Sequence, residues 1–253
     1  MIYAIGDIHG KFDLLKRLYS AILKDIDASG DADNTIVFLG DYIDRGRQNR
    51  QVLDFLKYLE DFDGVEHIFL RGNHEDIFKE AMEKPRVEWA RRMWTQNGGQ
   101  AFLNEVGMDF DYFVNTFAWQ PYVNWMKYKL EDYYETEDYV FVHGGLDIRK
   151  TNMKDQEGES MRWARHTDKD WYRTFHKLVV HGHTPNADVQ VDINRINVDT
   201  SWSYSKYPGI VNLTAVALPN RRNDEVSPPR FLKVEDHIEA LVQYCKDTKS
   251  QFA

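Results

Sequence analysis

The sequence predicts an α/β fold in which two layers of β-sheet are flanked by helices, with a helical insert in the first half of the chain. Two observations predict it. Up to residue 70, short runs rich in β-branched residues alternate with segments of helical period. After residue 138, short strand-like runs follow one another with turn residues between them, which is typical of an antiparallel or mixed sheet.

The first 70 residues predict two βαβ units, because strands and helices alternate at the spacing that such units need. Within each expected helix the apolar residues recur every three or four positions, as on the buried face of a helix. Strands joined in this way form a sheet that is covered on both faces. The expected strands are residues 2–5, 35–39 and 67–70, and the expected helices are residues 12–26 and 51–62.

Residues 76–128 predict a helical insert beside the sheet, because this segment has no strand signal and is rich in aromatic residues. Its tryptophans are Trp89, Trp94, Trp119 and Trp125. The helical pattern is broken at Asn97-Gly98-Gly99. Core packing is the expected role of most of the rings. We expect the insert to belong to a single domain that spans residues 1–253.

The second half of the chain returns to strand-like runs after the insert. They favour a second sheet, antiparallel or mixed, because they are short and follow one another closely. The polar stretch at residues 149–159 is expected to be a loop. The expected strands are residues 138–142, 177–180, 189–193, 196–198, 210–218 and 230–234.

Composition and charge argue against several classes of protein, namely nucleic-acid-binding, membrane-binding and membrane-spanning proteins. The chain has 253 residues, enough for a sizeable core, and a net charge of −9, which argues against general binding of nucleic acid or of an anionic membrane. No apolar run is long enough to cross a bilayer, and the N-terminus enters a strand without the pattern of a secretory signal. The single cysteine, Cys245, excludes an intramolecular disulfide and suits a reducing compartment. A cytoplasmic location is therefore expected.

Five short motifs carry side chains that bind metals or phosphate, and the first three each follow an apolar, strand-like run. Open α/β sheets bind their ligands beyond the carboxyl ends of the strands, so we expect these motifs to meet there. One Asp-x-His alone is weak evidence, whereas the whole ordered set is hard to obtain by chance. The motifs are Gly6-Asp7-Ile8-His9-Gly10, Gly40-Asp41-Tyr42-Ile43-Asp44-Arg45-Gly46, Gly72-Asn73-His74-Glu75, His143-Gly144-Gly145 and Gly182-His183-Thr184.

The motif side chains predict a site for two metal ions. Asp7 and His9 are two positions apart, so in extended backbone they point the same way and can bind one ion together. Asp41 has two carboxylate oxygens and could bridge two ions. Oxygen and imidazole ligands without thiolate suit manganese, iron or zinc, and manganese is the ion we expect. The remaining donors, one amide oxygen and two imidazoles, are those of Asn73, His143 and His183.

Such a site predicts the hydrolysis of phosphoesters. Two metal ions about 3.5–4 Å apart would polarise a phosphoryl oxygen and activate a water molecule as hydroxide for in-line attack. His74 is the expected general acid for the leaving alkoxide, and Asp44 is the carboxylate expected to orient it and raise its pKa. Arginines would hold the phosphate oxygens. A catalytically silent fold used for protein binding would lack a ligand or the acid, and neither is missing.

The motifs Gly-Asp-x-His-Gly, Gly-Asp-Tyr-Ile-Asp-Arg-Gly and Gly-Asn-His-Glu, in this order, resemble those of the PPP family of metallophosphatases. The resemblance runs from Gly6 to Thr184. It implies the calcineurin-like metallophosphoesterase fold, a β-sandwich with flanking helices. It also implies Asp44 and His74 as the acid dyad and Arg45 as a phosphate ligand. One metal ion would be bound by Asp7, His9 and Asp41, and the other by Asp41, Asn73, His143 and His183.

The length of the chain resembles the bacterial and phage branch of this family, which contains serine/threonine protein phosphatases and hydrolases of diadenosine tetraphosphate. Trp163-Ala164-Arg165 has the spacing of the element that supplies a second phosphate arginine in this branch, and Arg162 is a close competitor. Arg71 is expected either to contact the substrate or to form a supporting salt bridge. The threonine after His183 is more typical of the phosphatases than of the tetraphosphatases.

We therefore expect a manganese-dependent serine/threonine protein phosphatase whose substrate is a phosphorylated protein. The alternative is a hydrolase of dinucleoside polyphosphates, of the diadenosine tetraphosphate type. That alternative requires an aromatic ring near the metal ions, on which a base can stack, and several arginines for the phosphates.

Overall fold

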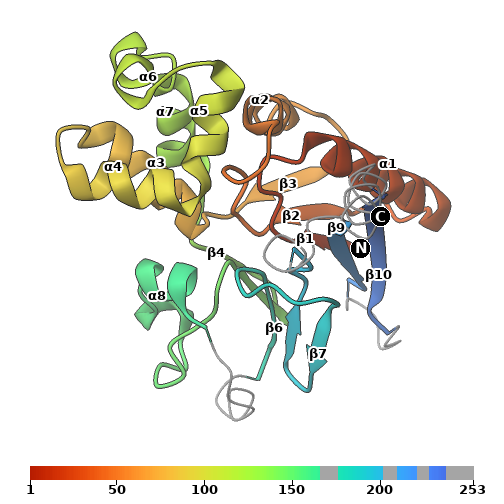
Figure 1. The fold of residues 1–253 in the computed structure, drawn as a ribbon. Helices are drawn as coiled ribbons and strands as arrows, with labels where there is room; N and C mark the ends of the chain where they lie inside the picture. The colour runs from red at the N-terminus through yellow and green to blue at the C-terminus, as the bar shows by residue number, and fades with distance from the viewer. Residues whose placement is uncertain (166–175, 202–209, 221–227, 238–253) are drawn as a thin grey trace, which may run out of the picture.

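A computed structural model describes residues 1–165, 176–201, 210–220 and 228–237 of the chain. Within them, two five-stranded sheets pack face to face and helices cover the outer faces (Figure 1). The predicted α/β architecture of two sheets flanked by helices is therefore confirmed. Cys245 lies outside the described residues.

The first sheet has the strand order β10-β9-β1-β2-β3. Strands β1, β2 and β3 are parallel, and β9 and β10 continue the sheet in antiparallel pairs beside β1. The sequence pattern assigned the last two strands to the second sheet, and this was wrong because a strand pattern gives the position of a strand and not its partner. The strands are β1 (Ile2–Ile5), β2 (Thr35–Phe38), β3 (Glu66–Phe69), β9 (Ile210–Leu218) and β10 (Arg230–His237).

The second sheet has the order β4-β5-β6-β8-β7 and is mixed, as predicted. Strands β5, β6 and β8 are parallel, and β4 and β7 pair antiparallel at its two edges. The expected loop at residues 149–159 contains the 3₁₀ turn η2 (Met153–Asp155) and the start of helix α8 (Gly158–Trp163), both too short to show a helical period in the sequence. The strands are β4 (Tyr133–Glu135), β5 (Tyr139–Val142), β6 (Leu178–His181), β7 (Gln190–Asp192) and β8 (Arg195–Asn197).

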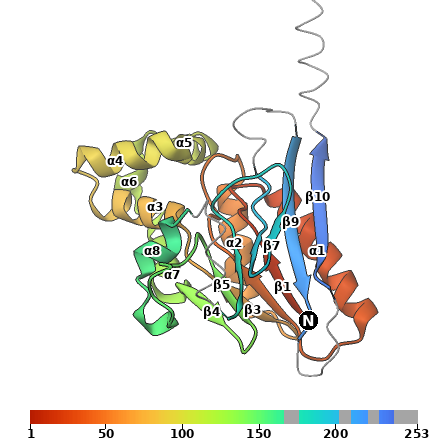
Figure 2. The same cartoon turned by 90° about the horizontal axis from the view of Figure 1, so that it is seen from below.

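Helices α1 (Phe12–Ser29) and α2 (Asn49–Leu59) follow β1 and β2, as the two βαβ units require. The region between β3 and β4 is helical, as predicted, and its helices gather in one group beside the sheets (Figure 1, Figure 2). These helices are α3 (Asn73–Glu83), α4 (Glu88–Trp94), the π-helical turn η1 (Thr95–Gly99), α5 (Gln100–Val106), α6 (Phe110–Thr116) and α7 (Gln120–Lys129). None of the helices in the described part of the chain combines the length and apolar character needed to cross a membrane.

Strand β1 shows how the core is divided between the layers. Its side chains alternate, so Ile2 and Ala4 pack between the two sheets, whereas Tyr3 and Ile5 pack in the cluster that contains residues of α1 and α2. All four are buried, with at most 3% of their surface exposed. Because both faces of the strand are fixed by packing, its register is fixed too, and so is the position of the polar loop that follows it.

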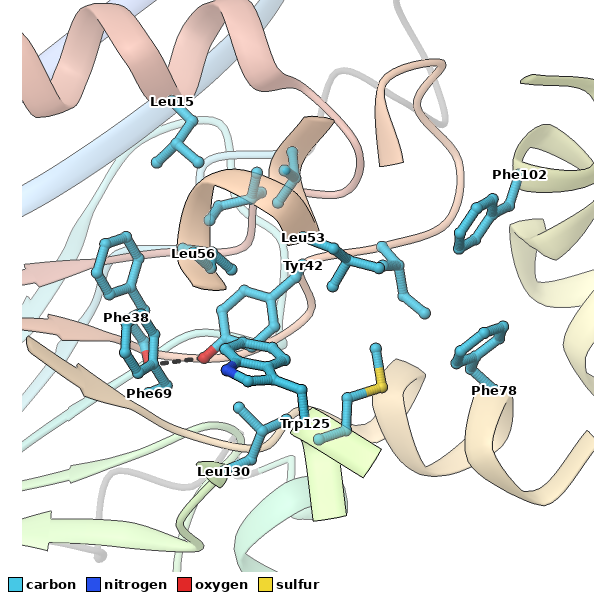
Figure 3. Packing of buried hydrophobic residues seen from close by; sticks show 14 of the residues in the cluster. Leu15, Phe38, Tyr42, Leu53, Leu56, Phe69, Phe78, Phe102, Trp125 and Leu130 are labelled. Atoms are coloured by element: carbon cyan, nitrogen blue, oxygen red, sulfur yellow. Dashed lines mark hydrogen bonds between the residues drawn. The ribbon is translucent and has the colours of Figure 1, made fainter. Parts of the chain in front are cut away.

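The insert joins the first sheet through an aromatic contact (Figure 3). Trp125 of α7 lies with its ring centroid 6.1 Å from Tyr42 and 5.6 Å from Phe69. The Tyr42 hydroxyl donates to the Leu70 carbonyl at 2.5 Å, which ties the loop after β2 to the end of β3. The prediction that most of the tryptophans of the insert are core residues is confirmed for Trp94, Trp119 and Trp125, all buried; Trp89 is 60% exposed.

Candidate metal centre

The six predicted metal ligands lie together at the carboxyl ends of five strands, three parallel strands of the first sheet and two of the second. The loops after β1, β2 and β3 meet those after β5 and β6 at one edge of the sandwich. Each of the six side chains belongs to a buried residue, with at most 5% of its surface exposed. They are Asp7, His9, Asp41, Asn73, His143 and His183.

Asp41 stands at the centre of this cluster. Its Oδ2 is 3.6 Å from His9 Nε2, while its Oδ1 is 3.3 Å from His143 Nε2. It belongs to two groups whose potential ligand atoms lie within 4.8 Å of one another, one with His9 and His74 and one with His143 and His183. The two carboxylate oxygens therefore face different groups, which is the arrangement that a bridging carboxylate needs.

The two ligands without a place in those groups lie beside them. Asp7 Oδ2 is 4.0 Å from His9 Nε2, and Asn73 Oδ1 is 3.0 Å from His143 Nε2. The backbone N–H of His183 donates to both Asp7 carboxylate oxygens, at 3.1 and 3.2 Å, and so links the two sheets across the site.

Two of the imidazoles are oriented by backbone carbonyls. The Nδ1 atoms of His9 and His143 lie 2.8 Å from the carbonyl oxygens of Ile43 and Leu39. A carbonyl oxygen only accepts, so Nδ1 carries a hydrogen in both rings, and Nε2, the nitrogen that remains to bind a metal, is directed to the cluster. This is the orientation that metal-binding histidines need.

The electrostatics of the cluster suit cations. Burial and the neighbouring Asp199 raise the pKa of Asp7 well above its usual value. Burial alone would lower the pKa of His143, but the Asp41 carboxylate outweighs it and raises that pKa to about 10. Burial and the charge of His143 lower the pKa of His183 to about 3, which favours the neutral imidazole that a metal binds. The negative charges that favour a proton on His143 would also favour a metal cation in place of that proton, so the buried carboxylates, the amide oxygen and the imidazoles fit a site for two divalent ions.

The backbone of the site is strained. Among the described non-glycine residues, positive φ angles occur at six positions, and five of them are predicted site residues. Such angles are uncommon outside glycine and cluster at functional sites. The five are His9 (46°), Asp41 (53°), Asp44 (72°), Arg45 (65°) and His183 (64°).

Glu75 stabilises the strained turn at Asp41. Its carboxylate accepts hydrogen bonds from the backbone N–H groups of Asp41 and Tyr42, both at 2.9 Å, and from that of Gly72 at 3.0 Å. The last of these closes the first turn of α3, where Glu75 is the third residue. One buried side chain thus connects the end of β2 to the helix that carries Asn73 and His74.

The predicted acid dyad is formed. His74 Nδ1 lies 2.7 Å from Asp44 Oδ2, and both side chains are buried. Burial alone would lower the pKa of His74, but the charges of Asp41 and Asp44 outweigh it and raise the pKa above its usual value. Its Nε2 lies 3.9 Å from Asp41 Oδ2, on the metal side of the ring. A protonated imidazole placed in this way can donate a proton to a group bound beside Asp41.

Two of the four predicted phosphate arginines reach the cluster. The Nη1 of Arg45 donates to His9 Nε2 at 2.7 Å and its Nη2 donates to His74 Nε2 at 3.0 Å, because a guanidinium only donates. To hold a phosphate beside a protonated His74, Arg45 would turn away from these two nitrogens. Arg165 Nε lies 3.0 Å from His183 Nε2. The two guanidinium groups therefore stand on different sides of the cluster, where both could contact one phosphate.

The other two arginines are directed elsewhere. Arg162 forms ion pairs with Asp76 of α3 and, at 2.5 Å, with Asp132. The Nη2 of Arg71 donates to the backbone carbonyls of Met126 and Leu130, at 3.0 and 3.2 Å. Of the alternatives left open for Arg162 and Arg71, these contacts favour a supporting role: Arg162 links α8 to α3, and Arg71 is bonded to the end of α7.

Sequence reasoning missed the residues that surround Asp44. The indole Nε1 of Trp94 donates to Asp44 Oδ1 at 2.8 Å. The side chain of Asn49 accepts from the Asp44 backbone N–H at 2.6 Å, and Glu105 accepts from the Asn49 backbone N–H at 2.6 Å. The glycine pair Gly98-Gly99 after Trp94 was a signal in the sequence that another part of the backbone approaches closely there. No sequence signal indicated that Asn49 and Glu105 lie near Asp44.

An exposed tryptophan borders the cluster. The ring centroid of Trp163 is 6.1 Å from that of His183, with the rings edge to face, and 39% of the residue surface is exposed. It lines a cavity of about 580 Å³ between α8 and the insert, together with Trp89, Met93 and Ile77. Trp163 thus lies between the predicted ligand His183 and this cavity, whose lining also includes the charged side chains of Arg71, Asp76 and Arg162.

Comparison with known proteins gives a family and several similar proteins, all of them phosphoesterases. Residues 1–210 match the family model described as calcineurin-like phosphoesterase. A segment of 80 residues is 41% identical to the serine/threonine-protein phosphatase PP1-delta of Caenorhabditis elegans, and it covers 29% of this chain but only 22% of that relative. Over 217 residues, 78% of this chain and 82% of the relative, it is 26% identical to the bis(5'-nucleosyl)-tetraphosphatase PrpE of Bacillus velezensis. The crystal structure of a provisionally assigned diadenosine tetraphosphatase has the same fold, with a TM-score of 0.59 and 17% identity over 92% of each chain.

Proposed function

This chain belongs to the calcineurin-like phosphoesterase family and is a metal-dependent phosphoester hydrolase, and we propose that it removes phosphate from phosphoserine or phosphothreonine in proteins. The observation that supports this substrate class is the buried Asp44–His74 pair, with His74 Nδ1 2.7 Å from Asp44 Oδ2. It offers a general acid beside the metal ligands.

The chemical reason lies in the leaving group. An alkoxide of serine or threonine is a strong base, so the P–O bond breaks readily only if the leaving oxygen receives a proton. A polyphosphate group that leaves from a dinucleotide is a much weaker base and needs that proton less. A protonated imidazole held by a buried carboxylate is therefore of most use to an alkyl phosphomonoester.

The residues of the site divide the work between them. When bound, two divalent ions, which we propose to be manganese, polarise the phosphoryl oxygens and make a water molecule more acidic. Arg45 and Arg165 hold the non-bridging oxygens from two sides. His74 gives its Nε2 proton to the leaving oxygen, and Asp44 keeps the ring in place. The ions would be held by Asp7, His9 and Asp41, and by Asp41, Asn73, His143 and His183.

A second candidate function is the hydrolysis of dinucleoside polyphosphates. The exposed ring of Trp163 favours it, because it lies 6.1 Å from His183 and offers a surface on which a base could stack. The relative with this activity in its name also resembles the chain over most of its length. Against it stands the leaving-group argument above.

The experiment is a steady-state comparison of the manganese-loaded enzyme on a phosphoserine peptide, p-nitrophenyl phosphate and diadenosine tetraphosphate. A kcat/KM that is highest for the peptide supports the proposal. A clear preference for the dinucleotide would replace it with the second candidate and make Trp163 the base-binding residue. Absence of turnover on all three, with both metal ions bound, would contradict both.

A further inference from the structure

Core packing explains the position of the Trp94 ring but not the hydrogen bond that its N–H makes in the site. Its indole Nε1 donates to Asp44 Oδ1 at 2.8 Å, while the other oxygen of the same carboxylate, Oδ2, lies 2.7 Å from His74 Nδ1. All three residues are buried, with at most 1% of their surface exposed. Tryptophan, carboxylate and imidazole thus form one chain of hydrogen bonds that begins in the insert and ends at the metal cluster.

The indole itself has little freedom to move. Its ring packs against Phe78, Phe102 and Phe113, with centroid distances of 5.2, 6.3 and 6.2 Å. On another side it lies directly on Gly99, where a Cβ atom would overlap the indole. Because the indole N–H is fixed in this way, the Asp44 carboxylate must keep its orientation for one oxygen to bond Trp94 while the other bonds His74.

The insert also holds the backbone around Asp44. The Gly98 carbonyl accepts from the Arg45 backbone N–H at 3.1 Å. Glu105 holds Asn49, whose side chain accepts from the Asp44 N–H at 2.6 Å. Asp44 and Arg45 have φ angles of 72° and 65°, so their turn needs such support to persist. Two contacts from the insert thus reach this turn directly, and a third, from Glu105, acts through Asn49; of the three, only that of Trp94 bonds the carboxylate.

We propose that Trp94 is a positioning residue for proton transfer: by bonding Asp44 Oδ1 it keeps Oδ2 on His74 Nδ1, so that His74 Nε2 faces the leaving oxygen. The inference rests on the proposed function of His74 as general acid. In the step concerned, an oxygen from water forms a new bond to phosphorus while the P–O bond to the leaving group breaks, and the proton on His74 Nε2 passes to the leaving oxygen. Trp94 takes no part in the bond changes, and its effect is on the orientation of the acid.

The test uses the dependence on the leaving group. In Trp94→Phe the ring packing is largely kept and the N–H is lost. We expect kcat for a phosphoserine peptide to fall about 10- to 100-fold, the usual effect of a lost hydrogen bond to a charged group. For p-nitrophenyl phosphate, whose leaving group needs no proton, kcat should change by less than about threefold. Binding of manganese, followed by thermal shift, should be unchanged.

The matched control is Trp119→Phe. Trp119 is also a buried tryptophan of the insert, but its Nε1 donates to the Val114 carbonyl at 2.9 Å and not to a site residue. This variant should lower kcat for both substrates equally or not at all. If Trp94→Phe does not fold, β-(3-benzothienyl)alanine at position 94 keeps the two-ring shape without the N–H and provides the same measurement.

The outcomes separate the inference from the function on which it rests. Equal losses for both substrates in the variant at position 94 would show that Trp94 only supports the fold, and no loss for either would show that it is not needed; both overturn the inference while the wild-type enzyme remains a phosphatase. A wild-type enzyme that turns over no phosphomonoester would instead refute the proposed function.

Discussion

The two sides of the metal cluster are built differently. On the acid side, Asp44 and His74 are buried and bonded to each other, and the insert holds their loop at several points. On the opposite side, His183 and Arg165 contact each other beside Trp163, which is 39% exposed. The comparison teaches that the residues proposed for proton transfer, which depends on geometry, lie where packing is complete. Contact with the variable parts of a substrate is what we propose for the open side.

The largest effect is expected on the acid side. Replacement of His74 by Asn keeps the polarity of the position and removes the proton donor, so kcat for a phosphoserine peptide should fall by about 10²–10⁴-fold. Steady-state kinetics checks this, with metal content measured on the same sample. Because His74 Nδ1 is bonded to Asp44 and the ring is not among the six proposed ligands, both metal ions should remain. Unchanged turnover, with two ions bound, would remove His74 as the acid.

A smaller effect is expected on the open side, where two neighbouring arginines can be compared. Arg165→Ala removes the guanidinium beside His183, and kcat/KM should fall about 10- to 100-fold, as for a lost charge-assisted contact. Arg162→Ala instead breaks the ion pairs with Asp76 and Asp132. It should lower the free energy of unfolding by about 1–3 kcal/mol and leave kcat/KM within a few fold.

The pair of variants is its own control, because both remove an arginine from the same short segment. Kinetics below the melting temperature of both proteins, together with urea denaturation, separates the two effects. A larger loss of kcat/KM in Arg162→Ala than in Arg165→Ala would reverse the assignment of the phosphate arginine.

The sequence was most informative where polar residues directly follow an apolar run, because that placement assigns them to the end of a strand. Carboxylates and histidines placed directly after apolar runs could be assigned to strand ends, and all six predicted ligands meet there. The partner of a strand depends on packing over the whole chain, so β9 was assigned to the wrong sheet. Long side chains with several possible partners were equally ambiguous. Arg162 lies only three residues before Arg165, and only the structure shows that its charge is directed to Asp76 and Asp132.

The role of Trp94 beside Asp44 could not be predicted, for another reason. A buried tryptophan in an apolar helix is most often a core residue, and Trp94 is one. Its hydrogen bond to Asp44 depends on the approach of two segments 50 residues apart, which local pattern does not encode. The acid side therefore has more hydrogen bonds than the motifs alone predict, because residues of the insert, which are not part of the motifs, bond to it.

The smallest effect concerns stability. It tests whether the first sheet, which contains β3, becomes less stable as the pH falls. His67 of β3 is half-buried, its Nε2 lies 2.9 Å from the Tyr19 hydroxyl oxygen, and its ring packs against Phe69. Burial lowers its pKa to about 4 from the ordinary 6.5. Between those two pH values the unfolded chain binds a proton that the folded chain does not, so the free energy of unfolding falls as the pH falls through this window.

The expected loss at His67 is about 1–2 kcal/mol once the partial exposure of the ring is allowed for. His67→Gln can still bond the Tyr19 hydroxyl but does not titrate, so its free energy of unfolding should change less between pH 6.5 and 4. Urea denaturation of both proteins at several pH values gives the difference, in which the titration of the metal-site carboxylates, common to both, cancels. Because His67 is remote from the reacting groups, kcat at neutral pH should not change. Parallel pH profiles for the two proteins would show that the acid sensitivity of the fold arises elsewhere than in β3.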